Sequence, residues 1–253
     1  MSKLKVSILQ YNISWKDKSS NFLKITTLLS DVKSDLVVLP EMFQTGFCVD
    51  DISIAETMEG QSVSFLKKAS LEFDLALCGS FLYLENASFF NRFVVVSEGE
   101  VVGYYDKVHL FSLGGEHNHI SAGGTKVDFV LKGFKFRPIV CYDLRFPYLA
   151  YNDTEYDVLL CVANWPSVRI AHWDTLLHAR SIENQAYVVG CNRVGEQPAS
   201  DGSYFYPGHS SAYTPNGKQL VHSHKEEIIT FEISKDSVAQ IRESLPFLGD
   251  RKM

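Results

Sequence analysis

Three residues with reactive side chains each follow an apolar run in this 253-residue sequence. Glu41 follows "DLVVLP", Lys107 follows "VVGYYD", and Cys141 follows "FRPIV". Such runs are typical of buried strands, and the strand ends of α/β sheets are where reactive groups from distant sequence positions converge. A carboxylate, an ammonium and a thiol that meet there would form a nucleophilic site.

Cys141 is the candidate nucleophile of this set. A free thiol with a pKa of about 8.5 is only a few per cent ionised at neutral pH, so it needs a base or a nearby cation. Glu41 can act as the base. Lys107 would favour the thiolate and would donate to the oxyanion that forms when a carbonyl is attacked, with the backbone N–H of Tyr142 as second donor. Spacing alone does not show that these residues meet. The structural alternatives are that Glu41 is a solvated turn residue, that Lys107 is a surface charge and that Cys141 is an inert buried residue.

The elements that must position these groups follow from hydrophobic periodicity. Amphipathic helical patterns cover 20–33, 60–73 and a segment after "NWPS", where Ser167 is the expected N-cap. The expected strands are 3–10, 35–39, 75–82, 89–97, 101–105, 127–131, 134–140, 157–163, 187–192, 209–213 and 226–232. Strands that alternate with helices predict an α/β layered fold, and no linker or repeat divides residues 1–253, so we expect a single domain.

Composition excludes several classes of function. The chain is 45% hydrophobic with a formal charge of −6 and has no basic run, so we expect no nucleic-acid partner. It has no apolar stretch of about 18 residues and no secretory signal pattern, so we expect a cytoplasmic protein without membrane association. Five cysteines without a CxxC pair predict neither a disulfide framework nor a thiolate zinc site.

Two HxH pairs, His117/His119 and His222/His224, are the remaining candidates for metal ligands. An HxH pair on a strand can ligate zinc, but neither pair has an HExxH motif or an obvious third ligand. The sequence therefore predicts no metal and no other cofactor.

The three reactive residues also lie in segments that resemble a known family. The segments "LPEMFQTGF", "YDKVHLF" and "CYDLRFP" are similar to the three signature segments of the nitrilase, or carbon–nitrogen hydrolase, superfamily, which carry its Glu, Lys and Cys in this order. The segments "VANWPSVRIAHWDTLLHARSIENQAYVVGCNRVG" and "YPGHSSAYTPNG" resemble those of its omega-amidase branch. The resemblance covers nearly the whole chain.

This resemblance implies an α-β-β-α sandwich of two stacked sheets and catalytic roles for Glu41, Lys107 and Cys141. Family members use a second glutamate after the lysine, and Glu116 in "GGEHNHISAGG" stands at the fitting distance. The implied activity is hydrolysis of a small primary amide, with the omega-amide of a 2-oxo acid, such as 2-oxoglutaramate or 2-oxosuccinamate, favoured. The family also implies a homodimer formed through the helices that follow the nucleophile, and "RFPYLAYN" supplies apolar side chains for such a contact.

Substrate choice stays open at this level. Phe43 and Trp165 can line the substrate pocket or belong to the core, and no arginine among Arg145, Arg169 and Arg193 can be assigned to a substrate carboxylate. A nitrile, an N-carbamoyl compound or an aliphatic amide is the alternative substrate for the same triad. A non-catalytic binding protein on this fold is a third possibility, although a scaffold would have no need of the four polar residues.

Overall fold

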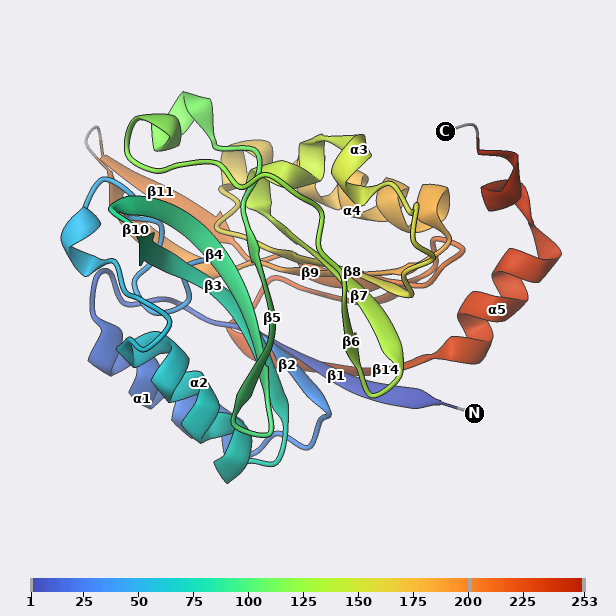
Figure 1. Ribbon diagram of the computed structural model, residues 1–253, viewed down its shortest axis with the longest axis horizontal. Helices are drawn as coiled ribbons and strands as arrows, with labels where there is room; N and C mark the ends of the chain where they lie inside the picture. The colour runs from blue at the N-terminus through green and yellow to red at the C-terminus, as the bar shows by residue number, and fades with distance from the viewer. Residues whose placement is uncertain (1, 200–201, 252–253) are drawn as a thin grey trace.

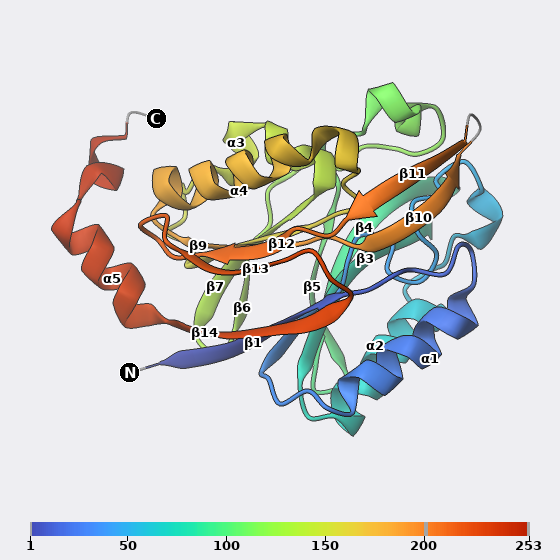
Figure 2. The same cartoon turned by 180° about the vertical axis from the view of Figure 1, so that it is seen from behind.

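Two six-stranded mixed sheets form the centre of the protein in a computed structural model that describes residues 2–199 and 202–251 (Figures 1 and 2). The strand orders are β14-β1-β2-β3-β4-β5 and β13-β12-β9-β8-β7-β6, and β10 pairs with β11 in a separate hairpin. The strands are β1 (Lys3–Gln10), β2 (Leu36–Val38), β3 (Ala76–Glu85), β4 (Ser88–Ser97), β5 (Glu100–Asp106), β6 (Phe129–Leu131), β7 (Phe134–Val140), β8 (Val158–Val162), β9 (Tyr187–Cys191), β10 (Val194–Ala199), β11 (Gly202–Pro207), β12 (Ser210–Tyr213), β13 (Gln219–Ser223) and β14 (Glu227–Ser234). The helices are α1 (Lys18–Leu29), α2 (Gln61–Glu72), α3 (Pro147–Ala150), α4 (Ile170–Asn184) and α5 (Lys235–Ser244).

The two sheets pack face to face, and helices cover their outer faces. Alternation along β8 shows this division, because Val158, Leu160 and Val162 point into the core between the sheets while Leu159 and Cys161 point toward the outer helices. Helices α1 and α2 pack on the outside of the first sheet, and α3 and α4 pack on the outside of the second (Figure 1). The predicted four-layer α-β-β-α sandwich is thereby confirmed.

Tight two-residue turns fix the register of three antiparallel pairs. Asn86 and Ala87 join β3 to β4, and both have positive φ, at 47° and 61°. The pairs Glu98–Gly99 and Lys132–Gly133 do the same for the β4–β5 and β6–β7 connections. Positive φ at both central residues is typical of the type I′ turn, whose twist matches that of the flanking strands.

Some elements differ from those that the sequence predicts. The β10–β11 hairpin, β13 and α5 were not among the expected elements. Ser167 is not the N-cap of the helix after "NWPS", because it begins a 3-10 turn (Ser167–Arg169) and α4 starts only at Ile170. None of the helices in the described residues is both long and apolar enough to cross a membrane.

Candidate active site

Cys141 stands at the first position after β7, where the chain turns sharply. Its φ is +48°, a left-handed conformation that a side-chain-bearing residue rarely adopts, and a 3-10 turn (Cys141–Arg145) begins there. The buried carboxylate of Asp143 holds this turn, since it accepts hydrogen bonds from the backbone N–H of Val140 at 3.1 Å and of His109 at 2.7 Å. Tyr105 donates its hydroxyl to the same carboxylate at 2.8 Å.

Lys107 lies between two carboxylates that are distant in the sequence. Its Nζ is 3.0 Å from Oε1 of Glu41 and 3.1 and 2.9 Å from the two carboxylate oxygens of Glu116. All three side chains are fully buried. Glu116 begins a 3-10 turn (Glu116–Asn118), and its Oε2 also accepts the backbone N–H of Phe111 at 2.6 Å.

Two asparagines fix the orientation of Glu41. Asn91, in the middle of β4, donates its side-chain amide to Oε1 of Glu41 at 2.8 Å. Asn164, just past β8, donates its backbone N–H to Oε2 at 2.8 Å and its side-chain amide to the Glu41 carbonyl at 2.6 Å. Both oxygens of a candidate base are therefore held by defined donors.

The electrostatics of the site keep the Cys141 thiol protonated. Burial raises the pKa of Cys141 well above its ordinary value, the Glu41 carboxylate adds to this rise, and Lys107 acts in the opposite direction. Burial alone would lower the pKa of Lys107, but Glu116 and Glu41 outweigh it and hold that pKa well above its usual range. Lys107 therefore favours the thiolate, as the sequence suggested, but burial and the Glu41 carboxylate outweigh its effect. A base must therefore take the proton as the thiol reacts.

Cys141, Glu41 and Lys107 open onto one cavity of about 270 Å³. Trp165 lines it, which is one of the two alternatives that the sequence left open, and Tyr142, the candidate backbone donor, lines it as well. Phe43 does not: it is fully buried in the core cluster of the first sheet and its outer helices, and its ring lies 6.4 Å from that of Phe22. The core interpretation therefore holds for Phe43, and the pocket interpretation is wrong.

The three candidate arginines lie in two different places. Arg145 and Arg169 line the cavity, where the guanidinium of Arg145 lies 4.8 Å from the ring centre of Trp165. Arg193 is buried elsewhere among its own partners, which include Gln197 and the carbonyl of Ile13. Burial lowers its pKa to about 10.

Sequence reasoning missed the three residues that hold the reactive groups in place. Asp143 and Asn164 each carried a local signal, because each lies within two residues of a position already singled out, Cys141 or Trp165, and follows a predicted strand. Asn91 carried none, since it stands inside a predicted strand and approaches Glu41 only through the pairing of β4 with β3. 

Solved structures of the nitrilase, or carbon–nitrogen hydrolase, superfamily share this stacked α-β-β-α sandwich. The sequence model of the carbon–nitrogen hydrolase family matches residues 5–243, and the chain belongs to this family. The resemblance seen in the three signature segments is thereby confirmed.

Full-length relatives and solved structures agree with this assignment. The chain is 37% identical to omega-amidase YafV from Escherichia coli (strain K12), over 99% of this chain and 97% of that protein. It is 34% identical to 2-oxoglutaramate amidase from Bacillus subtilis (strain 168), over 98% and 97% of the two chains. XC1258 from Xanthomonas campestris, a CN-hydrolase superfamily protein with an arsenic adduct in its active site, superposes with a TM-score of 0.95 at 35% identity, and the match covers 100% of this chain and 98% of that one.

Proposed function

We propose that this protein is a thiol amidohydrolase that converts the omega-amide of a 2-oxo dicarboxylic acid, such as 2-oxoglutaramate or 2-oxosuccinamate, to the carboxylate and ammonia. The observation that carries the proposal is the buried Glu41–Lys107–Glu116 network, which meets Cys141 at one cavity. The relatives named omega-amidase and 2-oxoglutaramate amidase support this choice of substrate.

The first half of the proposed reaction forms a thioester. Glu41 takes the proton of Cys141 while the sulfur attacks the carbonyl carbon of the primary amide. The ammonium of Lys107 has three N–H donors. One bonds Glu41 and one is shared by the two oxygens of Glu116, so the third serves the oxyanion, and the backbone N–H of Tyr142 is the second donor. Glu41 then returns the proton to the leaving nitrogen, the C–N bond breaks, and ammonia departs.

The second half regenerates the thiol. Glu41 takes a proton from a water molecule, whose oxygen attacks the thioester carbonyl. The C–S bond breaks, the proton returns to sulfur, and the product forms as a carboxylic acid, which releases its proton to solvent and leaves as the carboxylate. Glu116 acts on Lys107: its carboxylate positions the ammonium, and its negative charge keeps that group protonated throughout.

The cavity supplies cations for the far end of such a substrate. A 2-oxo dicarboxylic monoamide carries a carboxylate next to its keto group, and Arg145 and Arg169 are the two arginines that line the cavity. A guanidinium binds a carboxylate in a bidentate manner that no neutral residue reproduces. Replacing the arginine that binds the substrate should therefore raise KM for the 2-oxo monoamide.

Ammonia release from a panel of small amides and nitriles tests the proposal. We expect a short 2-oxo dicarboxylic monoamide to give a kcat/KM at least about tenfold above that of its nitrile analogue, about 1.4 kcal/mol in transition-state binding. Glutamine should be poorer than its 2-oxo counterpart because its ammonium must be desolvated. Cys141→Ala should abolish all turnover.

Each result of this panel has a separate meaning. Equal or better turnover of the nitrile, or of glutamine, would overturn the omega-amide assignment and leave the triad intact. Turnover by Cys141→Ala would overturn the thiol mechanism itself. No turnover of any amide, nitrile or N-carbamoyl compound by the unmodified protein would favour the non-catalytic alternative.

The proposal extends to assembly and compartment. We infer a single domain over residues 1–253, supported by the core that the two sheets share, and a homodimer, supported by the exposed ring of Tyr148 on α3, which is 55% accessible. Leu149 of the same short helix is buried in its own chain, so fewer apolar side chains are available for the contact than the sequence suggested.

All five cysteines carry free thiols, which supports a reducing compartment such as the cytoplasm.

A further inference from the structure

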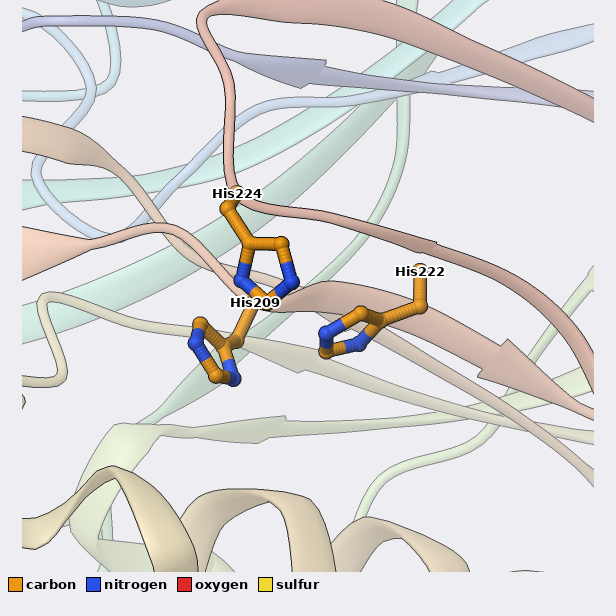
Figure 3. A group of neighbouring side chains, drawn as sticks. All are labelled: His209, His222 and His224. Atoms are coloured by element: carbon orange, nitrogen blue, oxygen red, sulfur yellow. The ribbon is translucent and has the colours of Figure 1, made fainter.

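Three histidine side chains gather at one end of the β12–β13 pair (Figure 3). His209 directly precedes β12, His222 lies in β13, and His224 directly follows β13. Their ligand nitrogens all lie within 4.8 Å of one another. The cavity of the candidate active site is lined by other residues, so the cluster is a separate feature of the fold.

Strand pairing brings these residues together. His222 and His224 are two positions apart, so strand alternation directs both side chains to the same face. The backbone N–H of His209 donates to the carbonyl of Ser223 at 2.8 Å, which places His209 beside the residue between them. The pair His222/His224 thus gains a third imidazole, that of His209, which the local sequence pattern did not reveal.

His209 is fixed on two sides. Its Nδ1 lies 2.9 and 3.1 Å from the two carboxylate oxygens of Asp174 in α4. A carboxylate can only accept, so Nδ1 carries the proton and Nε2 keeps its lone pair free for a ligand bond. The indole N–H of Trp173 donates to the His209 carbonyl at 2.8 Å and holds the backbone. A histidine held behind by a carboxylate is the arrangement that orients metal-bound imidazoles.

We propose that His209, His222 and His224 bind one divalent transition-metal ion, with Zn²⁺ as the ion best suited to three imidazoles and a water molecule. Zn–N bonds of about 2.1 Å in a tetrahedral site bring the nitrogens to about 3.4 Å from one another. The side chains of His222 and His224 are exposed, so their rings can turn inward and bring the nitrogens to this separation while Asp174 keeps His209 in place.

Zinc titration of a Cys141→Ala protein, stripped of metal with a chelator, tests the site by calorimetry and by metal analysis after dialysis. The Cys141→Ala background keeps the reactive thiol from binding zinc, and the readout is independent of catalysis. We expect one equivalent of Zn²⁺ per chain and a higher Tm in its presence. His222→Ala and His224→Ala should each weaken binding at least tenfold, and Asp174→Asn about tenfold or more.

His117→Ala is the matched control, because it removes an exposed histidine from the other HxH pair. It should leave zinc affinity and the Tm shift unchanged. Circular dichroism of the metal-free variants verifies folding. Binding of well under one equivalent, or equal affinity in His222→Ala, His224→Ala and His117→Ala, would overturn the proposal.

Discussion

Replacing Lys107 with methionine should make the stability of the protein fall as the pH rises. In the parent protein, Nζ of Lys107 lies 3.0 Å from Glu41 and 2.9 Å from Glu116, and all three side chains are out of contact with water. At an effective dielectric constant of about 20, each contact corresponds to about 5 to 6 kcal/mol of attraction. The two carboxylate oxygens can be at most about 6 Å apart, so their repulsion is at least about 3 kcal/mol on the same scale.

Methionine removes both attractions and leaves the repulsion. Binding a proton to a carboxyl group with an ordinary pKa of about 4.3 costs only about 3.7 kcal/mol at pH 7, which is less than the lost attraction. The folded variant should therefore hold one proton on Glu116, whose pKa burial and the Glu41 carboxylate already raise and Lys107 alone opposes as a charge. A group whose pKa is higher in the folded than in the unfolded state makes its full contribution to the free energy of unfolding at pH values below its unfolded pKa. That contribution is lost as the pH rises toward the folded pKa. Stability should thus fall by about 1.4 kcal/mol per pH unit relative to the parent protein.

Urea unfolding at pH 6, 7 and 8 measures this slope. We expect the Lys107→Met protein to lose about 2 to 3 kcal/mol of unfolding free energy between pH 6 and 8 beyond any loss in the parent. Lys3→Met is the matched control, since Lys3 pairs with Glu232 at 2.6 Å on the surface and its loss should not change the slope. Adding Glu116→Gln to Lys107→Met should flatten the curve. Parallel curves for Lys107→Met and the parent would refute this account of the charges.

Four further outcomes are expected. Lys107→Met should lower amide turnover at least about a hundredfold at a pH where it is folded, since one oxyanion donor is lost; near-normal rates would remove Lys107 from the site. Limiting iodoacetamide should alkylate the partly exposed Cys141 before the buried Cys78, Cys161 and Cys191, at a rate that still rises above pH 8.5, because desolvation and Glu41 raise the Cys141 pKa; uniform labelling in peptide mass spectrometry would contradict this. Glu41→Gln should lower turnover at least about a hundredfold and yet shift Cys141 alkylation to lower pH, because it removes a charge that raises the pKa of the thiol; an unshifted alkylation profile would count against contact between the two groups. Light scattering should give about 57 kDa, twice the chain mass of 28.5 kDa, and the monomer mass would exclude the dimer.

The reactive groups could be predicted because their signal is local. Glu41, Lys107 and Cys141 each follow a short apolar strand, and a strand end is recognisable from a few neighbouring residues. Asn91 could not be predicted in the same way, because it reaches Glu41 through pairing between strands. The same holds for His209, which strand pairing brings to His222 and His224. Phe43 shows the limit most simply. It is two residues from Glu41, but Met42 between them has a φ of +46°, and the chain turns there so that Phe43 enters the core.

The missed elements have a common physical cause. Helix α5 reads "KDSVAQIRES" and buries only Val238, so its periodicity is almost entirely polar. In β11 most of the described side chains are exposed, and in β13 exposed positions again predominate. The strands form because they pair with neighbouring strands, and the helix forms because its backbone hydrogen bonds are made within it. A hydrophobic pattern reveals neither contribution.

The pairing of β1 with β14 has a consequence for the way the protein is made. Residues Lys3–Gln10 form eight register pairs with Glu227–Ser234, more than 200 residues further along the chain. At about 5 to 20 residues per second, a ribosome adds the second partner roughly 10 to 45 seconds after the first. During that interval the free edge of β1 presents unpaired backbone groups beside Val6 and Ile8, which is a template for pairing with other chains. The first sheet can be completed only after almost the entire chain has been synthesised. Until then, the exposed edge of β1 depends on chaperones or on rapid late folding for its protection.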